Sequence, residues 1–91
     1  HQGRYEEAAR RYRRLLKVRP EEVVGLNNLA WIFADELGAP EEAVTRAAEA
    51  NRLKPNQWWL LDTWAWALGK AGKVDPALRK IEQALAQRPD N

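Results

Sequence analysis

The sequence contains no cysteine, no serine and no methionine, and its single histidine is the first residue. Without cysteine the chain has no disulfide and no thiolate nucleophile. Without serine, and with His1 as the only imidazole, neither a serine–histidine triad nor a histidine-based metal site is available. No glycine-rich phosphate loop is present either. We therefore expect no catalytic activity, no cofactor and no bound metal.

Strand-forming residues and long apolar runs are also scarce. Ala, Leu, Glu, Arg and Lys dominate, whereas β-branched residues are few, which favours helices. Hydrophobic residues make up 45% and charged residues 31%, as in a soluble helical protein. No run approaches the roughly 20 apolar residues that span a bilayer. The net charge of +2 is too small to indicate a nucleic-acid ligand, and the absence of cysteine does not decide the compartment.

What the sequence does contain is an internal repeat. Three stretches align at offsets of 35 and then 34 residues, and each has a glycine, then an alanine, then a proline at fixed spacing. The aligned positions are Gly3, Gly38 and Gly72; Ala8, Ala43 and Ala77; and Pro20, Pro55 and Pro89. Three columns with the same offsets indicate a repeat protein.

A second pattern precedes two of these stretches. Its apolar residues are spaced by three and four positions, which places them on one stripe of a helix. They are Leu26, Leu29, Ala30 and Phe33, matched 35 residues later by Leu61, Trp64, Ala65 and Leu68. Because the glycines that follow are only 34 residues apart, the first full unit has one extra residue between Phe33 and Gly38.

These signals predict five helices with short turns between them. Glycine suits the end of the first helix of each unit, where a positive φ is often required, and proline marks where the second helix stops. The predicted helices cover about 3–18, 23–37, 40–53, 57–70 and 74–87.

The pattern resembles the tetratricopeptide repeat (TPR) family, whose 34-residue unit pairs two antiparallel helices. It departs from the family pattern in placing Leu26 and Leu61 at the first aromatic position and alanine at the glycine that follows. The resemblance implies an all-α fold, an α-solenoid of antiparallel helix pairs with about 2.5 repeats and five helices. It also implies that the first helices line a concave surface on which peptides bind.

One array then accounts for residues 1–91. Residues 23–55 and 56–89 match full units, and residues 3–20 match a second helix alone. Repeat arrays normally carry polar end caps, whereas the last predicted helix keeps an apolar stripe. We therefore expect a fragment of a longer array, with self-association through the uncapped ends as a further expectation.

Four of the five tryptophans lie in the segment WWLLDTWAW, residues 58–66. Trp64 falls on the apolar stripe of its helix, so we predict that it lies in the core. Trp59 and Trp66 are seven positions apart and share another face, on which we expect Trp59 to be the more exposed. Trp58 lies between the two faces and stays unassigned.

The face that carries Trp66 is the predicted binding surface. Trp31 lies 35 residues before Trp66 and should stand beside it on the neighbouring first helix. Exposed aromatic clusters mark contact sites, and tryptophan is a frequent hot-spot residue. The candidate partner-binding residues are Asn27, Trp31, Trp59, Asp62, Trp66 and Lys70.

The sequence therefore predicts a non-catalytic module that binds a peptide or partner segment on the concave face. We expect a ligand with apolar or proline residues and a basic side chain near Asp62. The alternative is a structural spacer or self-association segment whose tryptophans serve packing. Residues 1–20 hold seven basic and two acidic side chains, but charged solvated faces are common, so nucleic acid ranks below a protein partner.

Overall fold

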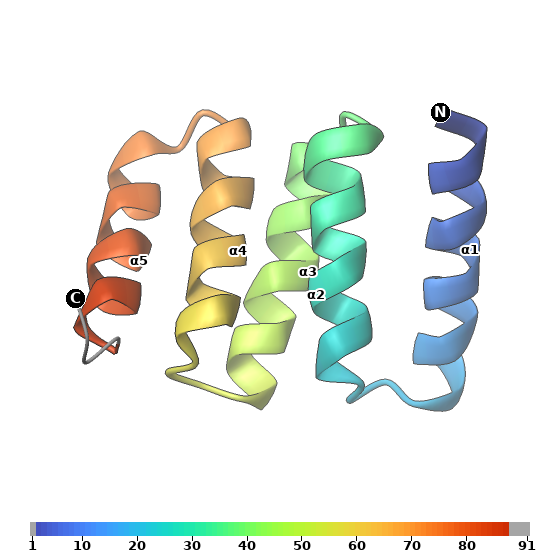
Figure 1. The fold of residues 1–91 in the computed structure, drawn as a ribbon, viewed down its shortest axis with the longest axis horizontal. Helices are drawn as coiled ribbons and strands as arrows, with labels where there is room; N and C mark the ends of the chain where they lie inside the picture. Colours follow the sequence, from blue (N-terminus) through green and yellow to red (C-terminus); the bar gives the residue numbers. More distant parts are fainter. Residues whose placement is uncertain (1, 88–91) are drawn as a thin grey trace.

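The computed structural model describes residues 2–87, and its fold is all-α, with five helices packed in sequence order. Consecutive helices run in opposite directions, from α1 at one end of the molecule to α5 at the other (Figure 1). The helices are α1 (Gln2–Val18), α2 (Val23–Trp31) continued by the π-helical segment η1 (Ile32–Glu36), α3 (Pro40–Leu53), α4 (Trp58–Lys70) and α5 (Val74–Ala86). These bounds confirm the predicted helices to within one residue.

Glycine ends the first helix of each pair, as the sequence predicted. Gly38 has φ +62° and Gly72 has φ +80°, a left-handed conformation that other residues adopt only at a cost. The two turns therefore need glycine for their backbone shape.

The extra residue of the first pair lies within its first helix. A backbone hydrogen bond from Ala39 N–H to Phe33 C=O closes the first turn, and the bond from Lys73 N–H to Leu68 C=O closes the second. The first bond joins residues six positions apart, whereas the second joins residues five positions apart. The extra residue therefore lies in the segment from Phe33 to Ala39, as expected. The helix absorbs it as the π-helical segment η1, since one added residue converts an α-turn into a π-turn.

Small and large apolar residues alternate through the core. Three alanines of α3, at 0–1% exposure, let α2 and α4 approach closely, while Leu29 and Leu60 fill the space between the helices. Each buried leucine contributes about 2–3 kcal/mol of transfer free energy. The buried alanines of α3 are Ala43, Ala47 and Ala50.

One buried polar side chain fixes α4 against α3. The amide nitrogen of Asn51 donates to Ala47 C=O at 2.9 Å and to Leu60 C=O at 3.1 Å. These two bonds satisfy the buried amide nitrogen, which would cost about 1–3 kcal/mol if it were unpaired, whereas the amide oxygen of Asn51 is enclosed without a partner. Asn51 therefore fixes the position along α3 at which the first turn of α4 packs.

Trp64 does not lie sealed in the core, contrary to the prediction. Its ring is half-buried, and the ammonium group of Lys80 lies 4.1 Å from the ring centroid. The other predicted stripe residues of α4, Leu61, Ala65 and Leu68, are buried. The indole is too large for α5 to cover completely, so a basic side chain of α5 lies over the open face as a cation–π contact.

Within residues 2–87 no helix is both long and apolar enough to cross a membrane.

Candidate functional site

Trp31 of α2 and Trp66 of α4 stack on one another across neighbouring first helices. Their ring centroids are 5.6 Å apart and their planes differ by 29°. The prediction that they stand side by side is confirmed. The stack does not remove them from solvent, because Trp31 stays 37% exposed and Trp66 stays 43% exposed. We call this pair the tryptophan ladder.

Hydrogen bonds fix both rings of the ladder. Trp31 Nε1–H donates to Thr63 Oγ1 at 2.9 Å, and Thr63 Oγ1–H donates to the carbonyl oxygen of Trp59 at 3.1 Å. Trp66 Nε1–H donates to Asp35 Oδ1 at 2.6 Å. Each indole N–H therefore bonds to the partner helix, so the ladder offers a ligand its ring faces rather than its donors.

Asp35 is a site residue that sequence reasoning missed. It lies in η1, so the inserted residue sets its position. The residue 35 positions later is Lys70, whose ammonium group lies 5.2 Å from the Trp66 ring centroid. Trp66 thus contacts an acid at its N–H and a base over its ring. The irregular offset of the repeat was the available signal, because π-turns concentrate at functional positions.

Four of the six predicted site residues line one open groove. Trp31, Asp62, Trp66 and Lys70 lie together around a hollow of about 680 Å³ beside α4 and α5. Its remaining lining is apolar, namely Ala65, Gly69, Ala77 and Ile81. Asp62 is half-buried there and, among the described residues, has no hydrogen-bond or ion-pair partner.

The other two predicted site residues lie elsewhere. Trp59 was expected to be the more exposed of its pair, and that prediction is wrong. It is half-buried and packs against the buried cluster of Leu26, Ala50 and Leu60, because the first turn of α4 lies over the end of α3. Asn27 is also half-buried, and its Oδ1 is enclosed without a hydrogen-bond partner. Neither residue lines the groove.

Trp58 is the exposed tryptophan at the start of α4, at 42% exposure. It precedes Trp59 by one position and so points about 100° away around the helix. The sequence left this residue unassigned, and the packing of α4 on α3 decides which of the two rings faces outward.

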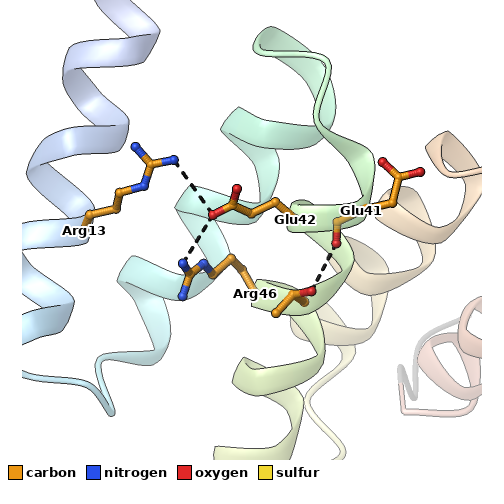
Figure 2. A network of polar contacts seen from close by, with 5 residues as sticks. Arg13, Glu41, Glu42 and Arg46 are labelled. Carbon is orange, nitrogen blue, oxygen red and sulfur yellow. Dashed lines mark hydrogen bonds and ion pairs between the residues drawn. The ribbon is translucent and has the colours of Figure 1, made fainter.

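The basic side chains of α1 are partly used for helix packing. Figure 2 shows Arg13 of α1 and Arg46 of α3 converging on Glu42, at 3.8 and 3.3 Å. The guanidinium group of Arg13 also lies 4.9 Å from the ring centroid of Phe33. Partly exposed ion pairs of this kind contribute about 0–1 kcal/mol each, and here they join α1 to the next pair. Exposed basic residues that line a separate shallow hollow on α1 include Arg10, Arg14 and Lys17.

In the part of the chain that the structure describes, no group of three or more His, Cys, Asp and Glu side chains is placed to hold a metal ion.

Comparison with known proteins identifies the repeat. A family model described as the tetratricopeptide repeat matches residues 1–57. The chain belongs to the tetratricopeptide repeat family. A TPR repeat-containing protein of Pseudomonas aeruginosa is 32% identical over 72 residues, which cover 79% of this chain and 12% of that relative. TPR modules generally mediate protein interactions and are typically non-catalytic, so protein partners are the general implication of the family.

Proposed function

We propose that this TPR module binds a protein segment on the face of α2 and α4 that carries the tryptophan ladder, and that it does so without catalysis. The observation that carries the proposal is a stacked pair of indole rings, each more than a third exposed. Exposed aromatic clusters on small proteins are unusual and tend to mark contact surfaces.

The tryptophan ladder stays exposed even where another first helix packs beside it. Trp31 has α4 packed beside it and is still 37% exposed, whereas Trp66, the next ring along, is 43% exposed. A neighbouring first helix therefore leaves more than a third of the Trp31 side chain accessible. This supports a surface that runs along successive first helices.

Pre-organisation supports binding as well. The bonds from Trp31 to Thr63 and from Trp66 to Asp35 hold both rings before any ligand arrives. A side chain that is already ordered loses little entropy on association, whereas each mobile side chain costs about 0.5–1.5 kcal/mol. Rigid aromatic residues are accordingly common hot spots.

The test is selection from a displayed peptide library on the immobilised chain, followed by comparison with Trp31→Ala and Trp66→Ala. We expect peptides retained by the wild type to lose at least tenfold in affinity on either variant, as hot-spot truncations of about 2 kcal/mol do. Arg14→Ala on α1 is the control, because it truncates an exposed side chain away from the ladder. Unchanged affinity on folded Trp66→Ala contradicts the proposal.

A structural role is the second candidate, and the outer face of α5 favours it. Leu78, Ile81 and Leu85 are 52%, 40% and 50% exposed on one stripe of this helix. Residues 23–55 and 56–89 would then form a section of a longer array, with the ladder as inter-repeat packing. Light scattering over a range of concentrations tests it, since association through this stripe raises the mean mass and Leu85→Glu, outside the groove, reverses it.

A further inference from the structure

The hydrogen-bonding groups of the ladder surface are unbalanced. Both indole N–H donors are consumed, by Thr63 and by Asp35. The carboxylate of Asp62, in the same groove, has no partner among the described residues. A carboxylate accepts hydrogen bonds and donates none, so Asp62 is a spare acceptor in the groove, while the ammonium group of Lys70 lies over the Trp66 ring. A ligand that complements Asp62 must bring donors.

The surroundings of Asp62 make an ionic ligand group favourable. Asp62 is half-buried, and the two indole rings and apolar side chains such as Ala65 and Ile81 line the same groove. Charge–charge attraction is stronger in such a partly dry groove than in open water. A carboxylate without an ion partner in such a groove is therefore stabilised by a cation that reaches it.

The molecule itself shows that the ladder accepts a cation. The ammonium group of Lys70 lies 5.2 Å from the Trp66 ring centroid, at the edge of the same groove. A ring face with this contact has the orientation that cation–π interaction requires. Lys70 thus occupies ring surface that a ligand cation would otherwise use.

We propose that the groove receives an arginine side chain of the bound protein segment, with Asp62 as its ion partner and the tryptophan ladder as its stacking surface. Arginine fits better than lysine because its planar guanidinium group can stack on an indole while it bonds to a carboxylate. Lys70 competes with this arginine, because its ammonium group covers part of the Trp66 ring and repels a second cation. This inference rests on the proposed function and names the chemistry of its partner.

The experiment uses three blocked heptapeptides of alanine and proline whose central residue is arginine, citrulline or glutamate. Citrulline has the shape of arginine without its charge. Calorimetry measures affinity, and the indole N–H signals of Trp31 and Trp66 report where each peptide binds. We expect the arginine peptide to bind about tenfold more tightly than the citrulline peptide, as one charge-assisted contact allows.

Two substitutions test the roles of the charges. Asp62→Asn should reduce arginine affinity to the citrulline level. Its matched control is Glu41→Gln, which removes one exposed carboxylate at the start of α3, away from the groove, and should change nothing. Lys70→Gln should strengthen arginine binding about two- to fivefold, because it removes a competing cation. A purely structural Lys70 would not produce this increase.

Several outcomes overturn the inference. Equal affinity for the arginine and citrulline peptides, tighter binding of the glutamate peptide, or weaker arginine binding by Lys70→Gln each contradicts it. Groove signals that shift with protein concentration alone would identify a second copy as the occupant instead. If all three peptides shift the ladder signals equally, the inference fails while the proposed function stands. If none binds, the inference fails, and the library selection decides the proposed function independently.

Discussion

The indole N–H of Trp66 donates a 2.6 Å hydrogen bond to the carboxylate of Asp35, 31 residues earlier in the chain. Trp31 makes the reciprocal connection, from α2 to Thr63, 32 residues later on α4. The stacked rings are thus bonded in both directions across two helix pairs. The ladder is therefore part of the packing between the pairs and also part of their exposed surface.

The bond between Asp35 and Trp66 gives the first prediction. Asp35→Ala should free the Trp66 ring, so that its indole N–H signal shifts upfield and broadens and its fluorescence shifts to the red. The stability cost should be about 1 kcal/mol, below the range for buried charged bonds, because this one is exposed. Glu36→Ala, at the next exposed position of η1, is the control and should leave the signal in place. An unaltered Trp66 signal in Asp35→Ala would contradict the bond.

The π-helical segment gives the second prediction. Deleting Glu36 should restore a continuous α-helix. The deletion removes one residue, so the bond that closes the first turn would span five positions, as the bond that closes the second turn does. We expect the chain to stay folded, with a Tm no lower than that of Asp35→Ala, and the Trp66 signal to move because Asp35 changes its direction. Two-dimensional NMR and a thermal melt followed by circular dichroism measure both.

A deletion in the second pair is the matched control. Removing Ala71 shortens a turn that has no residue to spare, because the bond from Lys73 N–H to Leu68 C=O closes it over five residues. This variant should lose stability clearly. Equal melting behaviour of the two deletions would show that η1 is not an insertion.

Two glycines near the same turn give a third prediction: replacing each by alanine should change the stability of the fold in opposite directions. Gly72 has φ +80°, so Gly72→Ala should destabilise the fold by about 1–2 kcal/mol. Gly69 lies in α4, and an added Cβ would meet nothing within 4 Å. Gly69→Ala should therefore stabilise the fold by about 0.5–1 kcal/mol, because alanine favours the helix. Thermal melts compare them, at roughly 4–8 °C per kcal/mol for a domain of this size. Changes of the same sign in both variants would contradict the reasoning.

Much of the candidate site could be read from the sequence, and the misses have a common origin. The offset of 35 residues placed Trp31 beside Trp66, and helical spacing placed Asp62 and Lys70 near them. The same spacing wrongly made Trp59 the most exposed ring. Position around a helix is a local property, whereas the part of the helix that a neighbour covers depends on how both helices cross.

The sequence by itself determined the period, the helices and the turns of this protein, because helical spacing, glycine at positive φ and proline act within a few residues of the chain. Tertiary structure alone decided which indoles are covered. Packing of α4 on α3 buries much of Trp59 and leaves Trp58 outside. The π-turn brings Asp35 to Trp66. Those outcomes depend on contacts between residues of different helices, whose distances no local pattern encodes.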